Sequence, residues 1–269
     1  MECKNDIKTT ENYSMISALK KMLKKILSPH QIQVLRESRI NSYYSNIVAR
    51  LFSRDLTKLA MIYGSDKQGR HSYSTHYHMN FNKIRNKKLK ILEIGVGGYE
   101  NSHLGAASLR MWKRYFPKSM IYSIDIYDKS ALQEKRIKIF QGHQADEAFL
   151  KNICSQIGPL DIIIDDGSHI VSHVLASFKI LFPFLKEDGI YVIEDTQTSY
   201  WPSWGGNSEN LNDSATSMNF FKNLTDSLNY QEFLKPDYVP SYFDRHIVAI
   251  HFYHNLVFIY KGQNNEPKI

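Results

Sequence analysis

Apolar and polar positions in the middle of the chain follow two different periods, which predicts strands alternating with helices. Short apolar runs are typical of buried strands, and they occupy 91–94, 121–126, 137–140, 160–164 and 190–193. Helical spacing covers 108–115, before Pro117, and 171–185, before Gly189. The run at 160–164 is rich in isoleucine, as expected for a strand with both faces buried in a parallel sheet. This alternation predicts a doubly wound α/β sheet.

The end of the chain has a different pattern. After a segment with helical spacing at 217–228, apolar runs at 247–253 and 256–260 flank the pair His254-Asn255 with no helix between them. This pattern indicates a hairpin. We therefore expect a mostly parallel seven-stranded sheet with an antiparallel edge hairpin at its C-terminal end.

The first part of the chain carries the pattern of a basic amphipathic helix. Apolar residues recur at helical spacing over 13–27, four lysines fall between them, and Pro29 ends the pattern. Such a helix can lie on an anionic membrane, but most amphipathic helices bury their apolar face against protein. We expect residues 1–55 to form a helical extension that packs on the domain or mediates a homo-oligomer. Peripheral membrane contact is the less favoured alternative.

Composition excludes several classes of protein. Apolar residues make up 42% and charged residues 23% of the 269-residue chain, which is ordinary for a folded globular protein. No run approaches the ~18 apolar residues of a membrane-spanning helix, and the lysines near the start do not fit a signal peptide. Cys3 and Cys154 form no disulfide framework, which favours the cytoplasm as the location.

The positive charge is unevenly distributed along the chain. The formal net charge is +7, and residues 1–40 hold eight Lys and Arg against four Asp and Glu. A second basic cluster at 83–90 precedes an apolar run, and no nucleic-acid-reading motif accompanies either cluster. We expect the second cluster to be a solvated strand entrance, and we expect no nucleic acid as a partner.

Acidic and polar residues gather where the predicted parallel strands end. A parallel sheet binds its ligands at the carboxyl ends of its strands. Those ends hold Glu93 with the glycines after it, Asp125, Gln144, Asp165-Asp166 and Glu194-Asp195. A buried strand needs none of these groups for its stability, so they predict a site at this edge of the sheet.

The glycines of loop 95–98 let a ligand approach the backbone closely. A dinucleotide fingerprint requires a further glycine where Glu100 stands, and this acid would oppose a pyrophosphate. The loop suits a cationic or zwitterionic ligand instead, and Asp125 can accept hydrogen bonds from both hydroxyls of a ribose. This combination resembles the class I S-adenosylmethionine methyltransferases. The candidate cofactor contacts at the strand ends are Glu93, Gly95, Gly97, Asp125, Gln144 and Asp165.

Further segments narrow the resemblance. They are Tyr63-Gly64-Ser65-Asp66-Lys67, Ser108-Leu109-Arg110-Met111-Trp112, Asp165-Asp166-Gly167-Ser168-His169, and Ile193-Glu194-Asp195-Thr196 with Thr198-Ser199-Tyr200-Trp201. In this order they resemble the metal-dependent sugar O-methyltransferases of macrolide tailoring, the mycinamicin and macrocin methyltransferase family, which has cephalosporin-hydroxylase-like relatives. The resemblance covers about residues 56–262 and implies a Rossmann-like methyltransferase domain there, with 1–55 before it and 263–269 as a tail.

The resemblance also implies a magnesium ion on Asp166, Glu194 and Asp195, with His169 as the general base. Three carboxylates from two neighbouring strand ends independently suit a hard divalent cation. The ordinary pKa of a histidine, about 6.5, suits a base near neutral pH. An ion chelated by two neighbouring sugar hydroxyls lowers the pKa of one of them, and His169 can take its proton while the methyl group transfers from S-adenosylmethionine.

Two other functions are weighed against this one. A metal-dependent hydroxylase needs an iron-binding triad, which Asp166, His169 and another histidine could supply, but Glu194 and Asp195 suit magnesium better. A catalytically silent binding protein has no need of all four residues. As acceptor, both a glycosylated natural product and a cell-surface glycan stay open. His173, four residues after His169, is expected to be an ordinary helix residue.

Two more segments are expected at the site. The resemblance implies that 63–77 folds over the methyl donor, with Tyr63, Ser65 and Lys67 as candidate contacts, whereas Tyr77 can equally belong to the core. The polar segment 197–216 has the length of a lid. Its aromatic side chains suit stacking on a sugar or a macrocycle, although Trp201 can equally anchor the loop to the sheet. The candidate acceptor-binding residues are Tyr200, Trp201 and Trp204.

Overall fold

The computed structural model describes residues 39–267. The chain divides into two units, residues 1–51 and 52–269. In the first unit the structure describes one helix, α3 (Arg39–Leu51), so the predicted helix at 13–27 lies outside the described residues. The boundary expected at residue 55 stays a prediction.

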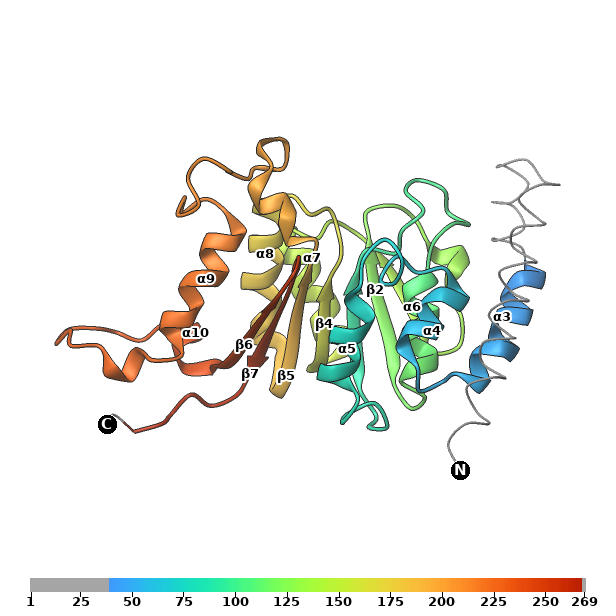
Figure 1. Cartoon of the computed structure of the whole chain (residues 1–269), viewed down its shortest axis with the longest axis horizontal. Coiled ribbons are helices and arrows are strands. Elements are labelled where there is room, and N and C mark those ends of the chain that lie inside the picture. Colours follow the sequence, from blue (N-terminus) through green and yellow to red (C-terminus); the bar gives the residue numbers. More distant parts are fainter. Residues whose placement is uncertain (1–38, 268–269) are drawn as a thin grey trace, which may run out of the picture. The chain divides into compact units, whose positions relative to one another are not determined.

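The second unit is built on one seven-stranded sheet, as the sequence pattern predicts (Figure 1). Its order is β3-β2-β1-β4-β5-β7-β6, with β7 antiparallel to both β5 and β6 and all other neighbours parallel. The strands are β1 (Lys90–Ile94), β2 (Met120–Asp125), β3 (Ile137–Gln141), β4 (Leu160–Asp165), β5 (Leu185–Glu194), β6 (Ile247–Tyr253) and β7 (Leu256–Lys261).

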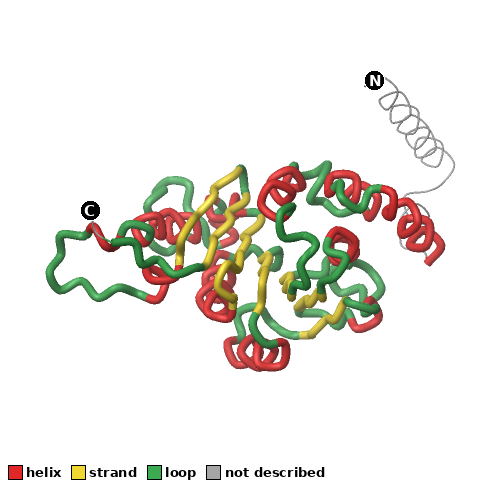
Figure 2. Tube along the Cα trace, turned by 90° about the horizontal axis from the view of Figure 1, so that it is seen from below, coloured by secondary structure: helices red, strands yellow, loops and turns green. Residues whose placement is uncertain are grey.

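Helices lie on both sides of the strands (Figure 2). Those that precede or follow the first strands are α4 (Leu56–Tyr63), α5 (Tyr73–Phe81) and α6 (Ala107–Tyr115). The later ones are α7 (Glu147–Ile157), α8 (Val171–Leu181), α9 (Ser217–Ser227) and α10 (Tyr242–His246). Successive strands joined through helices give the doubly wound arrangement expected from the alternating pattern.

The two faces of the sheet bury different residues because side chains alternate along a strand. On β7, Val257 and Ile259 join the apolar cluster that includes α7, α8 and α9. Phe258, between them, packs against Tyr77 and Phe81 of α5. Strand β7 is therefore covered on both faces, which fixes the position of α5 beside the carboxyl end of the sheet.

Two local expectations are wrong. The helix expected at 171–185 ends at Leu181, because Pro183 has no backbone N–H to continue it, and β5 already begins at Leu185 with Gly189 inside the strand. The basic cluster at 83–90 is not wholly solvated. Arg85 is buried, its guanidinium lies 5.3 Å from the ring centre of Tyr115, and it donates a hydrogen bond to the carbonyl of Ser53.

Among residues 39–267, no helix has both the length and the apolar character needed to cross a bilayer.

Candidate active site

Acidic residues from three adjacent strands meet at the carboxyl edge of the sheet. Because β1, β4 and β5 are neighbours, Glu93, Asp166 and Glu194 bring carboxylate oxygens to within 4.8 Å of one another. Asp166 also belongs to a second group of the same size, with His169 and Asp195. Glu194 and Asp195 thus fall into different groups, and Asp166 is the residue that both groups share.

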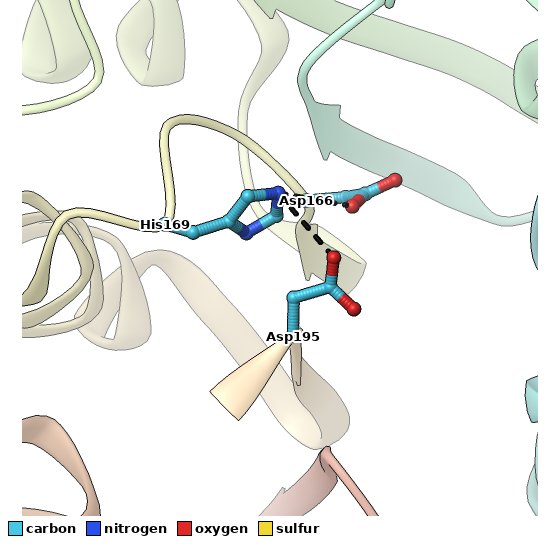
Figure 3. A group of neighbouring side chains, drawn as sticks. All are labelled: Asp166, His169 and Asp195. Carbon is cyan, nitrogen blue, oxygen red and sulfur yellow. Dashed lines mark ion pairs between the residues drawn. The ribbon is translucent and has the colours of Figure 1, made fainter. Parts of the chain in front are cut away.

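His169 points toward two carboxylates (Figure 3). Its Nε2 lies 3.8 Å from Oδ1 of Asp166 and 3.7 Å from Oδ2 of Asp195. His169 and Asp195 both have left-handed backbone conformations, with φ of 57° and 51°. This conformation is uncommon for residues other than glycine, and Asp and His adopt it more readily than most residues do. Here it turns both side chains toward the same point.

The segment 63–77 supplies partners for these carboxylates. Lys67 is fully buried, and its Nζ lies 2.8 Å from Asp166, 2.5 Å from Glu194 and 3.2 Å from Glu93. A compact loop positions it, since Ser74 donates its backbone N–H to the carbonyl of Lys67. The loop therefore delivers one ammonium group to three acids from three strands.

The first turns of α5 contact the same edge through two tyrosines. The hydroxyl of Tyr73 donates a hydrogen bond of 2.7 Å to Oδ1 of Asp195, and the hydroxyl of Tyr77 donates to Glu194. His71 stacks on Tyr73, and its Nε2 lies 3.6 Å from Oδ1 of Asp195. Tyr77 is also buried among aromatic rings, so it belongs both to the core and to the site.

Burial and charge act differently on these acids. Burial raises the pKa of Glu93 to about 7, although Lys67 opposes this shift. Burial and the neighbouring Asp166 raise the pKa of Glu194 well above its usual value. Burial would also raise the pKa of Asp195, but a tyrosine hydrogen bond and two nearby histidines lower it. Burial would lower the pKa of Lys67, but the surrounding carboxylates raise it well above its usual value.

The glycine loop lies directly beside this cluster. Gly95 has φ of 97°, and a Cβ there would lie 2.2 Å from the backbone oxygen of Asp166, so only glycine fits. Gly97, with φ of 76°, faces open space. Asp125 at the end of β2 accepts the N–H of Val96 at Oδ2 and the N–H of Tyr127 at Oδ1, both at 2.9 Å. This fixes the carboxylate of Asp125 against the loop.

Gln144 and Asp165 are buried beneath the loop that carries His169. Gln144 donates to Asp165 and accepts the N–H of Ser168, at 3.2 and 2.7 Å. The other carboxylate oxygen of Asp165 accepts the hydroxyl of Ser177 in α8, and burial raises the pKa of this acid to about 6. These contacts give both residues a role in holding the loop, and their predicted contact with a cofactor stays a prediction.

The other predicted site residues are spread over two segments. Tyr63 ends α4, and the hydroxyl of Ser65 accepts the backbone N–H of Lys67 at 3.4 Å. On the opposite side, Tyr200 and Trp204 are partly buried in short 3₁₀ turns, and Trp201 is 46% exposed. The ring centre of Trp204 lies 6.4 Å from that of His169. The structure thus brings Trp204, of the three aromatic residues, next to the predicted base.

The chemistry of the donor set fits a divalent cation. Carboxylate oxygens are the ligands that Mg²⁺ prefers, and Oδ1 of Asp166 and Oδ2 of Asp195 face the same partly open space beside His169. Lys67 and Tyr77 both bind Oε1 of Glu194. Of the three predicted ligands, Asp166 and Asp195 therefore lie together beside His169, whereas Glu194 groups with Asp166 around Lys67.

The sequence did not reveal that Lys67 forms ion pairs with the three buried acids, nor that Tyr73 and His71 contact Asp195. Lys67, Tyr73 and His71 lie in or next to the segment Tyr63–Lys67 that carries the family resemblance. The motif therefore marked the right segment, but nothing in it says that its side chains bind acidic groups rather than a cofactor.

Comparison with known proteins gives close relatives. The mycinamicin VI 2''-O-methyltransferase of Micromonospora griseorubida is 47% identical over 217 residues, which are 80% of this chain and 54% of that protein. The demethylmacrocin O-methyltransferase of Streptomyces fradiae is 46% identical over 217 residues, which are 80% of this chain and 55% of that protein. The chain thus spans about half the length of these curated relatives. No protein-family model matches it.

Solved structures give the same result. MycE methyltransferase from the mycinamycin biosynthetic pathway, in complex with Mg, SAH and mycinamycin VI, has a TM-score of 0.77 and 46% sequence identity to this chain. The superposition covers 80% of this chain and 55% of that one. The shared region is therefore most of the chain described here and about half of that enzyme.

Proposed function

Because the chain is homologous to the sugar O-methyltransferases of antibiotic biosynthesis and has their Rossmann-like methyltransferase fold, we propose that it is a metal-dependent O-methyltransferase. It moves the methyl group of S-adenosylmethionine to a hydroxyl oxygen of a sugar. The acceptor is a glycosylated small molecule, and a glycosylated natural product is the class that the relatives support. We also propose a cytoplasmic homo-oligomer, which gives the N-terminal extension a partner.

One observation carries this proposal. Asp166, His169 and Asp195 converge beside a glycine loop, in a chain that is 46% identical to an enzyme seen with Mg, SAH and its macrolide. A binding protein without catalysis does not require an imidazole placed beside two carboxylates that suit a cation. The arrangement serves a reaction that needs both a cation and a base.

Each group of the site has a definite task. Loop 95–98 and Asp125 would hold S-adenosylmethionine, the carboxylate accepting from the ribose hydroxyls. Asp166 and Asp195 would hold a divalent ion beside His169, and Glu194, whose Oε1 is bound by Lys67 and Tyr77, would add its other carboxylate oxygen. Such an ion when bound lowers the pKa of a coordinated hydroxyl. Trp204 forms a wall next to His169 on which a sugar can stack.

His169 receives the proton of the acceptor. The sugar oxygen forms its new bond to the methyl carbon as the sulfur–carbon bond of the donor breaks, and the hydroxyl proton passes to Nε2 of His169. Nε2 lies 3.8 Å from Asp166 and 3.7 Å from Asp195, so the base stands directly beside the carboxylates that would hold the ion. Holding donor and acceptor in line supplies much of the remaining acceleration.

A direct assay tests the proposal. The purified full chain is incubated with isotopically labelled S-adenosylmethionine, Mg²⁺ and a panel of macrolide and aromatic polyketide glycosides that carry unmethylated sugars. We expect label on a sugar oxygen of at least one glycoside, and loss of the reaction with EDTA. Hydroxylation with iron and 2-oxoglutarate, or no binding of S-adenosylmethionine, would contradict the proposal.

A further inference from the structure

The three acids of the buried group already surround a cation that belongs to the protein. Glu93, Asp166 and Glu194 are arranged with the spacing of a metal site, and the ammonium of Lys67 lies within 3.2 Å of an oxygen of each. The side chains of Lys67 and Glu93 are fully buried, and that of Glu194 is 3% exposed. Three acids collected in such a place repel one another unless a positive charge lies among them.

Asp166 separates this cation from the open part of the site. Its Oδ2 binds Lys67, whereas its Oδ1 faces His169 and the space next to Asp195. One carboxylate therefore serves the lysine on the buried side and leaves its other oxygen for an ion on the open side. While Lys67 is in place, Oδ1 is therefore the oxygen of Asp166 that an ion beside His169 would meet.

We propose that Lys67 takes the place of a second divalent ion and so makes the site mononuclear. This inference rests on the function proposed above. Enzymes with two metal ions hold them ~3.5–4 Å apart, bridged by shared carboxylates, and Asp166 has the position of such a bridge. Lys67 acts as a positioning residue: it fixes the acids and assigns the single ion to the half of the site that contains His169.

Counting bound ions tests this role separately from catalysis. The full chain is titrated with Mn²⁺ as the probe, and bound ions are counted by equilibrium dialysis and by electron paramagnetic resonance, which detects spin coupling between neighbouring Mn²⁺ ions. We expect one uncoupled ion in the wild-type protein. Lys67→Met keeps much of the side-chain volume and removes the charge, and it should bind two coupled ions. Lys67→Arg keeps the charge and should bind one.

Glu93→Gln supplies a second test, in case Lys67→Met does not fold. Glu93 contacts Lys67 and not the open half of the site, so Glu93→Gln should keep one Mn²⁺ with its affinity changed by less than about 3-fold. In the double variant Glu93→Gln with Lys67→Met, the number of bound Mn²⁺ ions should return to one, because the second ion loses one of its three acids.

A folded Lys67→Met protein with one ion, or a loss of Mn²⁺ affinity of more than about 10-fold in Glu93→Gln, would overturn the inference. These outcomes leave the proposed methyl transfer intact. A wild-type chain that binds no Mn²⁺ would overturn the metal-dependent function and the inference together.

Discussion

The Nζ of Lys67 lies 2.8 Å from Oδ2 of Asp166, although 99 positions separate the two residues in the chain. The first follows α4 in a loop, and the second follows β4 at the centre of the sheet. Their contact ties the segment before the first strand to the carboxyl edge where the acids gather. It also divides the oxygens of Asp166 between a buried cation and the open space beside His169.

Replacement of the proposed base tests its role without disturbing the backbone. His169→Asn should lower turnover by about 100- to 10,000-fold, the usual contribution of a general base. Asparagine tolerates the left-handed conformation that His169 adopts, so the fold and the affinity for S-adenosylmethionine should persist. Methyl transfer and isothermal titration calorimetry measure the two quantities. His246→Asn, on α10, is the control and should retain full activity. An active His169→Asn enzyme would remove this residue from the base role.

The two glycines of the loop should differ in their tolerance of alanine. At Gly97 a Cβ faces open space, so Gly97→Ala should lower the free energy of unfolding only by the cost of a left-handed backbone in alanine, about 1–2 kcal/mol. At Gly95 the same atom meets the backbone of Asp166, and a clash in a packed region adds about 1–3 kcal/mol. Urea unfolding of both variants measures the difference. Equal stabilities would show that the loop and the backbone of Asp166 leave room for a Cβ at position 95.

The carboxylate of Asp125 should matter for binding the donor. Asp125→Asn keeps the size of the side chain but removes the charge that accepts from the loop and, by our proposal, from the ribose. We expect the affinity for S-adenosylmethionine to fall by about 10- to 100-fold, since hydrogen bonds to charged groups contribute about 1.5–3 kcal/mol. Asp128→Asn, three residues later and exposed, is the matched control and should bind normally. Unchanged affinity in Asp125→Asn would place the ribose elsewhere.

Asp244 should make the stability depend on pH. Burial alone would raise its pKa, but hydrogen bonds from Ser227, Tyr238 and Ser241 outweigh this effect and lower it. A lowered pKa in the folded state stabilises the protein above the unfolded value of about 4 and loses this contribution as pH falls through the folded pKa. Asp244→Asn should therefore lower the free energy of unfolding by about 1–3 kcal/mol at pH 7, and by progressively less below pH 4.

Chemical denaturation at several pH values measures this difference. Asp226→Asn, on the exposed surface of α9, is the control and should follow the pH dependence of the wild-type protein. If the free energies of unfolding of Asp244→Asn and wild type differed by the same amount from pH 7 to pH 3, the protonation of Asp244 would not be coupled to stability.

Much of the fold follows from local patterns in the sequence. Runs such as 160–164 and 247–253 are strands because they are short and rich in β-branched and aromatic residues, a property that does not depend on the strands they pair with. The end of α8 departs from the expectation because apolar spacing continues past Pro183, whereas the missing N–H of the proline stops the helix. Arg85 departs from the expectation for a related reason, since its burial depends on the ring of Tyr115 and the carbonyl of Ser53, which are distant in the sequence.

The sequence by itself determined the alternation of strands and helices and the gathering of acids at strand ends, because both depend on neighbours along the chain. Only the tertiary structure decided which groups those acids bind. Placing β4 between β1 and β5 puts Asp166 next to both Glu93 and Glu194. Packing of α5 beside β7 then brings Tyr73 to Asp195 and, through the loop before it, Lys67 to Asp166. A long side chain can reach in many directions, so its partner is set by the packing of distant elements and not by the residues next to it.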